Sequence, residues 1–307
     1  MGYMEKGSRI LFGMLSAVAF VSLAFPIRSL AANGTWELQK DGKRWKYMYS
    51  PENYAADEWI EDQGKEYYVD SSGYMRTGWV TDKDDNARYY MGKDGAKCFN
   101  TFTPDNHYVG PDGMILEAFD TYRKQVSKQL KTFVNKKAKD AKQHGFLLTD
   151  LNNDGYRDIA VFDNFMTPER VLQVAVWMPE EEELVVLANS DSDAAEHSFL
   201  TYNKEEQVTY LTILEESGGR NYFSLEKGEC NFGNALSLEL SQNDWGDPIY
   251  YVNGDKIKAE ELEEILETMQ AQTGGAFSEQ ILPVNEENIK LKVDCSPSED
   301  ELSLWQP

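Results

Sequence analysis

The residues with the clearest chemical potential form a short run of oxygen-bearing side chains between two apolar segments. Acidic or amide side chains occupy alternate positions from residue 150 onward and recur at residue 158, with a glycine after the third of them. Alternate residues point toward the inside of such a loop, and glycine permits the sharp turn that wraps an ion. Hard oxygen donors at this spacing favour Ca²⁺. The predicted ligands are Asp150, Asn152, Asp154, the backbone carbonyl of Tyr156, and Asp158.

The end of this loop differs from that of a complete EF-hand. Its twelfth position is Val161 rather than a bidentate glutamate, and the apolar run 158–162 predicts a strand instead of a helix. The loop resembles the Asp-x-Asp-x-Asp-Gly loops of extracellular calcium-binding β proteins. We expect a structural calcium ion with a dissociation constant on the order of 10⁻⁴ M. The alternative is a metal-free turn held by Asp and Asn side chains.

Candidate catalytic groups are few. The sequence has three histidines and contains no His-Glu-x-x-His motif, Gly-x-Ser-x-Gly motif or phosphate-binding loop. His197 lies between Glu196 and Ser198, but neighbouring strand residues point to opposite faces, so these three residues do not form a catalytic triad. We therefore assign no catalytic residue and predict a non-enzymatic binding protein. The alternative is a glycoside hydrolase that uses a pair of carboxylates.

The composition is that of a globular acidic protein. The chain has 307 residues, of which 53 are acidic and 30 basic, and its formal charge is −23. Such a charge argues against nucleic acid as a partner, because the protein and the phosphates repel each other. The sequence identifies no protein partner and no oligomeric state. Three cysteines do not define a pairing: Cys98, Cys230 and Cys295.

The N-terminal residues have the pattern of an export signal. Lys6 and Arg9 precede an apolar run over 10–25, and small residues lead up to a predicted cleavage after Ala31. Residues 1–31 are therefore predicted to be a signal peptide. After cleavage, we expect a secreted protein of the cell wall or extracellular space that has no membrane segment.

Aromatic residues repeat between residues 34 and 116. Trp59 and Trp79 open two of the copies, and each copy combines an aromatic strand, a turn rich in Asp, Ser and Gly, and a second short strand. A unit of this size cannot bury its own apolar face, so the copies are predicted to stack as a β-hairpin solenoid. Three tyrosine–glycine pairs share a spacing of five residues: Tyr68 and Gly73, Tyr90 and Gly95, Tyr108 and Gly113.

This segment resembles the cell-wall-binding repeats, of the choline-binding type, in Gram-positive surface proteins. The resemblance rests on Gly73–Trp79, followed by the pair Tyr89 and Tyr90 and by the turn at Asp94 and Gly95. It implies a hairpin solenoid whose aromatic side chains cage the quaternary ammonium of choline on teichoic acid by cation–π attraction. The ligand-binding residues implied by the resemblance are Trp59, Tyr68, Trp79 and Tyr90.

These copies differ from the family pattern at one position. In the family, a tryptophan usually directly precedes the two adjacent aromatic residues that end here in Tyr68, Tyr90 or Tyr108. Here those positions hold Glu66, Arg88 and Asn106. A positive charge at residue 88 would oppose a second cation. We therefore expect a cell-wall polysaccharide or teichoic acid as the partner, and the sequence leaves open whether choline itself is bound.

The pattern changes after residue 116. Apolar residues at helical spacing predict an amphipathic helix over 117–143, and eight apolar or alternating runs between 146 and 252 predict an antiparallel meander. A second helix is predicted over 255–269. Residues 117–285 are therefore expected to form an α+β module of unknown ligand, and 286–307 an acidic C-terminal tail. The predicted fold class is mostly β: an N-terminal β-hairpin repeat solenoid followed by an α+β domain with an antiparallel sheet.

Overall fold

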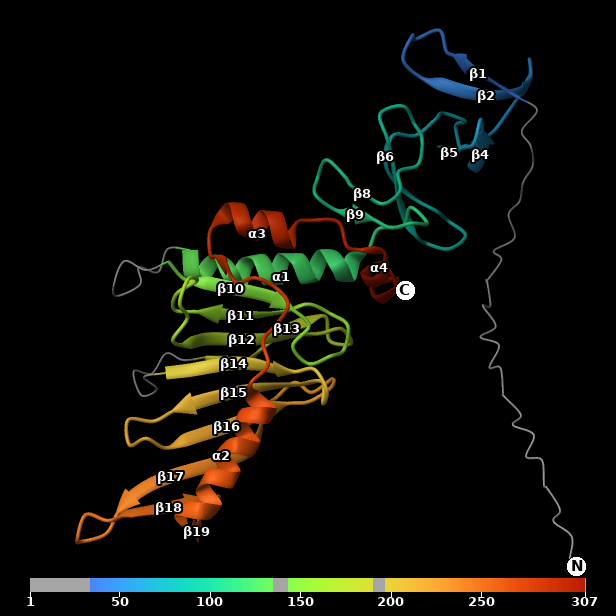
Figure 1. Cartoon of the computed structure of the whole chain (residues 1–307). Coiled ribbons are helices and arrows are strands. Elements are labelled where there is room, and N and C mark those ends of the chain that lie inside the picture. Colours follow the sequence, from blue (N-terminus) through green and yellow to red (C-terminus); the bar gives the residue numbers. More distant parts are fainter. Residues whose placement is uncertain (1–33, 135–142, 190–196, 307) are drawn as a thin grey trace, which may run out of the picture. The chain divides into compact units, whose positions relative to one another are not determined.

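The computed structural model describes residues 34–134, 143–189 and 197–306 (Figure 1). The predicted signal peptide, 1–31, lies outside the described residues. The chain divides into two compact units, residues 1–75 and residues 76–307, which are treated separately below. The predicted boundary between residues 116 and 117 stays a prediction. Within the described ranges, no helix has the length and apolar character needed to cross a bilayer.

The first unit consists of short antiparallel strands. One sheet has the order β1-β2-β3, and a separate hairpin joins β4 to β5. Its small core contains Tyr47, Ala55, Ile60 and Val69, all buried. The strands are β1 (Thr35–Leu38), β2 (Trp45–Ser50), β3 (Asn53–Tyr54), β4 (Glu58–Asp62) and β5 (Lys65–Val69).

Two further hairpins begin the second unit, and they continue the repeat. Strand β6 pairs with β7, and β8 pairs with β9, both antiparallel. Backbone hydrogen bonds link successive segments, for example from the Leu116 amide to the Tyr108 carbonyl at 2.9 Å. The strands are β6 (Gly78–Thr81), β7 (Arg88–Met91), β8 (Thr101–Phe102) and β9 (Tyr108–Val109).

One turn geometry recurs and explains the five-residue spacing. Gly73, Gly95 and Gly113 have φ angles of 78°, 81° and 83°, a region that glycine enters without steric cost. Each glycine amide donates to the carbonyl three residues earlier, at 2.7 Å, 3.0 Å and 3.0 Å. The accepting carbonyl lies two residues after Tyr68, Tyr90 or Tyr108, so each tyrosine has the same place in sequence relative to its turn. The prediction of a hairpin repeat is confirmed.

The long helix α1 (Glu117–Val134) packs on the first of two sheets in the second unit. The sheet has the order β13-β12-β11-β10-β20 and is antiparallel. Phe119, Tyr122 and Leu130 of α1 meet Ile159 and Trp177 of the sheet in one buried cluster. The strands are β10 (Gly145–Thr149), β11 (Asp158–Phe162), β12 (Val171–Met178), β13 (Glu183–Asn189) and β20 (Leu282–Pro283).

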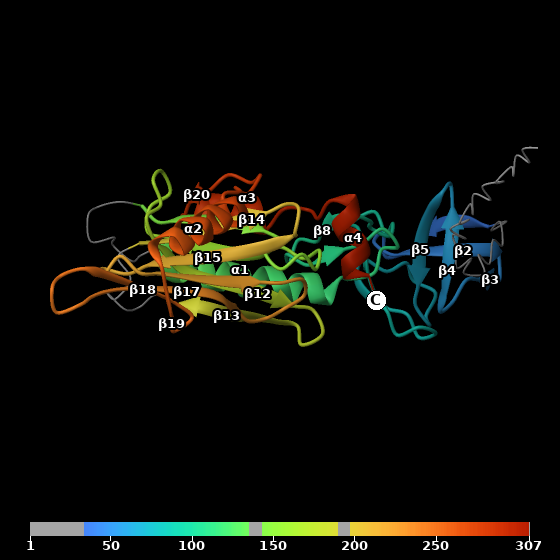
Figure 2. The same cartoon turned by 60° about the horizontal axis from the view of Figure 1, so that its bottom comes forward.

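The second sheet has six antiparallel strands in chain order, from β14 to β19. Leu211 and Leu225 of this sheet pack with Leu147, Ala160 and Val174 of the first sheet, on the side away from α1. Helix α2 (Ala259–Thr273) lies along the second sheet (Figure 2). The strands are β14 (His197–Asn203), β15 (Val208–Leu214), β16 (Arg220–Leu225), β17 (Gly233–Gln242), β18 (Pro248–Val252) and β19 (Asp255–Ile257).

The fold class is therefore mostly β with antiparallel sheets, as predicted. The described residues contain four helices, of which the sequence predicted two. The meander is split between two sheets rather than forming one, and the sequence patterns missed β14, β19 and β20. The second predicted helix, 255–269, begins and ends four residues later as α2, because β19 occupies its first three residues.

The C-terminal segment differs from the acidic tail expected over 286–307. It forms α3 (Glu286–Val293) and α4 (Glu299–Trp305), and Figure 1 shows α3 alongside α1. Ile289, Val293 and Trp305 are buried in the same cluster as α1. Glu286, Glu287, Glu299 and Asp300 are exposed, Asp294 and Glu301 form ion pairs with Arg123 and Arg157, and the spaced apolar residues anchor the segment. Side-chain caps from Asn285 and Ser298 start the two helices.

Candidate functional sites

Each predicted tryptophan of the repeats lies directly opposite its tyrosine. Trp59 pairs with Tyr68 across β4 and β5, and Trp79 pairs with Tyr90 across β6 and β7. The ring centroids are 5.2 Å and 5.1 Å apart in edge-to-face geometry, which is favourable for aromatic pairs. The structure therefore brings Trp59 together with Tyr68 and Trp79 together with Tyr90. Their role in ligand binding stays a prediction.

Trp79 has further contacts within its own unit. Its indole Nε1 donates to Asp105 Oδ2 at 2.8 Å, and its ring meets that of His107 at 5.6 Å. Hydrogen bonds from the Thr103 hydroxyl and the Trp79 indole hold the pKa of Asp105 below its usual value. The Arg88 guanidinium carbon lies 4.7 Å from the Trp79 ring centroid. The side chain is therefore fixed at its edge and covered on a face.

A comparable arrangement of cations and tyrosines occurs in the first unit. The Lys46 ammonium lies 3.5 Å from the ring centroid of Tyr54 and 4.7 Å from that of Tyr74. The Arg44 guanidinium carbon is 3.9 Å from the Tyr74 centroid. Sequence reasoning missed Tyr54 and Tyr74 as a pair. The available signal was the aromatic residue that directly follows the turn glycine Gly73.

A buried ion network joins the last hairpin to the first helix. Asp120 accepts hydrogen bonds from His107 Nδ1 at 2.7 Å, from the Tyr108 amide at 3.1 Å and from the Arg123 guanidinium at 2.7 Å. Arg123 also donates to Asp294 at 2.8 Å. Asp120 and Arg123 are buried, at 2% and 1% relative exposure. This histidine therefore has a structural partner, and the network fastens β9, α1 and α3 to one another.

The predicted calcium loop connects β10 to β11 and is folded as a tight turn. Asp150 accepts from the backbone amides of Asp154 at 3.2 Å and Gly155 at 2.8 Å. Asp154 accepts from the Tyr156 amide at 2.9 Å. Gly155 has a φ of 99°, which only glycine adopts readily. The loop therefore has the wrapped backbone that the sequence pattern indicates.

The fifth predicted ligand, Asp158, is fully buried. Its Oδ1 accepts from the Trp177 amide and its Oδ2 from the Leu151 amide, both at 2.8 Å. Burial raises the pKa of Asp158 well above its usual value, and the charges of Asp154 and Asp150 raise it further. This carboxylate therefore ties the loop to the neighbouring strand β12.

The remaining loop side chains bear on whether a cation fits. Burial raises the pKa of Asp150 and of Asp154, and the charge of Asp150 raises that of Asp154 further. Asn152 is fully buried; its amide donates to the Glu229 carbonyl, while its Oδ1 contacts no hydrogen-bond donor among the described residues. A bound cation would reduce the repulsion between the carboxylates and would give the Asn152 Oδ1 a partner.

The described ranges hold no ready-made group of three His, Cys, Asp or Glu side chains around one metal position. The carboxylates of Asp150 and Asp154 would therefore have to share their oxygens between the ion and the backbone amides that they now bind. The Tyr156 hydroxyl donates to the Leu304 carbonyl at 2.8 Å, which places this side chain against α4. Only its backbone carbonyl is left as a predicted ligand.

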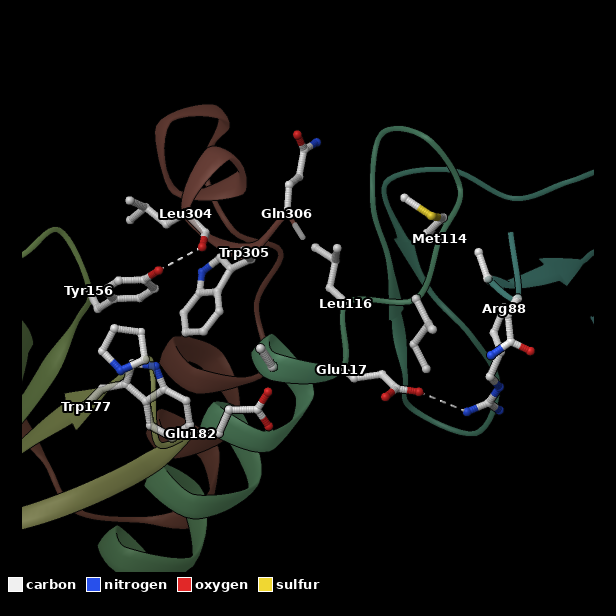
Figure 3. Close-up of a pocket in the computed structure, with 15 residues that line it drawn as sticks. Arg88, Met114, Leu116, Glu117, Tyr156, Trp177, Glu182, Leu304, Trp305 and Gln306 are labelled. Carbon is white, nitrogen blue, oxygen red and sulfur yellow. Dashed lines mark hydrogen bonds and ion pairs between the residues drawn. The ribbon is translucent and has the colours of Figure 1, made fainter. Parts of the chain in front are cut away.

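A cavity of about 540 Å³ lies in the second unit (Figure 3). Its lining includes the indoles of Trp177 and Trp305 and the carboxylates of Glu117 and Glu182. Glu117 forms an ion pair with Arg88 at 3.4 Å. The Trp177 indole N–H is buried and has no acceptor among the described residues. The site combines aromatic and acidic groups, but the two carboxylates have no assigned role.

The antiparallel hairpins with paired tryptophan and tyrosine rings define an aromatic β-hairpin repeat. Residues 56–102 match the family model described as the choline-binding repeat. The resemblance to repeats of this type is thereby confirmed for this segment. The match includes all four predicted ligand-binding residues and Arg88.

Solved structures of choline-binding proteins from Streptococcus pneumoniae are similar to about a quarter of the chain. Choline binding protein F is 28% identical over 26% of this chain and 25% of its own, with a TM-score of 0.22. The choline-binding domain of Spr1274 is 26% identical over 26% of this chain and 90% of its own, with a TM-score of 0.23. The chain thus spans about a quarter of the length of the first protein.

An enzyme is also among the similar structures. The modular Cpl-1 endolysin, solved with a peptidoglycan analogue, is 16% identical over 53% of this chain and 40% of its own, with a TM-score of 0.24. Values this low carry no argument about the module after the repeats. A search of curated proteins finds no match.

Proposed function

We propose that this protein is exported and attaches non-covalently to the cell wall through residues 34–116, which bind wall polysaccharide or teichoic acid. The observation that carries the proposal is the choline-binding repeat over 56–102, with its tryptophan–tyrosine pairs on adjacent strands. Aromatic side chains that recur from hairpin to hairpin suit a repetitive polymer, because each copy can contact a similar unit of the ligand. Trp59, Tyr68, Trp79 and Tyr90 are the proposed contacts.

The test is sedimentation of the full chain with purified Gram-positive cell walls. Trp59→Ala and Trp79→Ala should each weaken binding by about 1–2 kcal/mol, since each removes one aromatic contact. Trp245→Ala is the matched control, because Trp245 is 88% exposed and lies outside the repeats. If the wild-type chain stays in the supernatant, wall attachment is refuted.

We further propose that calcium stabilises the module through the loop that contains Asp150, Asn152, Asp154, Tyr156 and Asp158. The support is the wrapped loop, the raised carboxylate pKa values and the unpaired buried Asn152 oxygen. The ion would neutralise crowded negative charge and hold the β10–β11 turn. Its role would be structural, because the loop joins two adjacent strands of the sheet.

Thermal melts of the full chain in chelator and in millimolar calcium test this site. Calcium at about 100 times its dissociation constant should add about 2.7 kcal/mol to the free energy of unfolding. Asp154→Ala should remove most of this gain and leave the melting temperature in chelator little changed. Magnesium should substitute poorly, because it requires a smaller octahedral site. Equal wild-type melting temperatures in the two buffers would leave the metal-free turn as the explanation.

The proposed role is binding rather than catalysis, and it assigns no catalytic residue. The alternative is a wall-attached glycan hydrolase with a carboxylate pair, for which Glu117 and Glu182 in the cavity are the nearest candidates. Zymography on wall preparations distinguishes the two functions. A clearing band that Glu117→Gln or Glu182→Gln abolishes would replace binding with hydrolysis.

A further inference from the structure

The repeats already contain cations on their aromatic rings. The Arg88 guanidinium carbon lies 4.7 Å from the Trp79 centroid, and the Lys46 ammonium lies 3.5 Å from that of Tyr54. A quaternary ammonium binds an aromatic ring at the same kind of face and distance, by the same attraction to the ring's negative quadrupole. The side chain and such a ligand therefore compete for one position.

Arg88 is held at this position from two sides. Its guanidinium lies 3.4 Å from the Glu117 carboxylate, as Figure 3 shows, while it also covers the Trp79 ring. Its backbone is fixed as well, because the Arg88 carbonyl accepts from the Ile115 amide at 3.0 Å. An entering cation would have to break the ion pair and move Arg88, or meet its positive charge at close range.

Lys46 is held in a similar way between two rings. Its ammonium is 3.5 Å from the Tyr54 centroid and 4.7 Å from the Tyr74 centroid, and Arg44 covers Tyr74 at 3.9 Å. Two tyrosines around an ammonium make most of a cation cage. In this chain the occupant is a lysine of the same hairpin stack.

The charge of the repeats limits the remaining ligand classes. Residues 34–116 contain 15 acidic and 10 basic side chains, so their net charge is negative. This net charge disfavours a polyanion as the ligand. Uncharged saccharide is not subject to that repulsion.

We propose that Arg88 and Lys46 are specificity-determining residues that occupy the cation positions on the aromatic rings of these repeats and exclude quaternary ammonium ligands such as choline from them. This inference rests on the wall attachment proposed above and assigns its chemistry. It differs from the choline binding that the family resemblance implies.

The experiment measures choline binding to the full chain by equilibrium dialysis at constant ionic strength. A choline-derivatised resin is unsuitable, since a protein with a charge of −23 binds any cationic matrix. Arg88→Gln should bind choline at least about fivefold more tightly than wild type, which corresponds to about 1 kcal/mol. Lys46→Gln tests the other unit and should gain similarly.

Lys93→Gln is the matched control. It removes one positive charge from an exposed turn of the same repeat, so it changes the net charge equally without opening a ring. Thermal melts of each variant establish that it is folded. Arg88→Trp, which restores the residue usual in the family at this position, gives a second gain-of-binding variant should the glutamine variant be unstable.

Three results would overturn the inference: wild type that binds choline as tightly as Arg88→Gln, folded variants that gain no choline binding, or an equal gain in Lys93→Gln. Wall sedimentation separates this failure from that of the proposed function. If wild type sediments and free choline elutes it, attachment stands and the exclusion of choline fails. If wild type does not sediment, attachment fails, whatever the dialysis shows.

Discussion

Replacing Trp305 with alanine tests whether the C-terminal segment belongs to the core. The indole is 7% exposed, and its ring centroid lies 5.3 Å from that of Phe119, 5.1 Å from Tyr122 and 4.8 Å from Tyr156. Removing a buried tryptophan of this kind costs about 4 kcal/mol, from lost burial and the cavity that remains. For a unit of this size, that corresponds to a fall in melting temperature of about 8–16 °C.

The assay is thermal unfolding of the full chain, followed by near-ultraviolet circular dichroism. Trp245→Ala is the control, because this tryptophan is 88% exposed at the tip of the β17–β18 hairpin. It should change the free energy of unfolding by less than about 0.5 kcal/mol. If the two variants melt together within about 2 °C, the α4 segment contributes nothing to stability. The acidic tail expected from the sequence would then be the better description.

Two more substitutions test contacts that the structure assigns. Asp158→Ala should destabilise the chain by about 2–5 kcal/mol in urea, because it leaves the buried amides of Leu151 and Trp177 without an acceptor. This loss should be present in chelator and larger in calcium, because Asp158 is also a proposed ligand; a loss seen only in calcium would assign Asp158 to the metal alone. Asp120→Asn should cost about 3–5 kcal/mol, since Arg123 would remain buried with a weakened partner. A urea midpoint equal to that of wild type would show that the ion network does not stabilise the joint between β9 and α1.

The repeat is the part of the fold that sequence spacing predicted best. The tyrosine–glycine interval corresponds to one hydrogen-bonded turn, and the glycine is required because φ is positive there. The structure adds that Trp59 pairs with Tyr68 and Trp79 with Tyr90 across adjacent strands, although their separations in sequence differ. The chain between Trp79 and Tyr90 is two residues longer than that between Trp59 and Tyr68. The longer turn between β6 and β7 accommodates them, so the pairing is kept.

The loop that begins at Asp150 was predicted in its backbone form but only partly in its contacts. Local spacing indicated a wrapped turn, which the amide hydrogen bonds to Asp150 and Asp154 show. No local pattern indicates that Asp158 accepts from the Trp177 amide on the next strand. Calcium binding stays a prediction, because it depends on how the carboxylates share their oxygens.

By itself, the sequence determined the features that depend on neighbours in the chain: the hairpin repeat, the amphipathic α1, the mostly β class and the turn at the loop. Only the tertiary structure decided that Arg123 of α1 reaches Asp294, that the Tyr156 hydroxyl donates to the Leu304 carbonyl, and that Trp305 enters the core. The physical reason is how far along the chain each kind of interaction acts. Periodicity and turn chemistry act over a few residues, whereas these contacts join distant segments that meet only after the sheets and helices have packed.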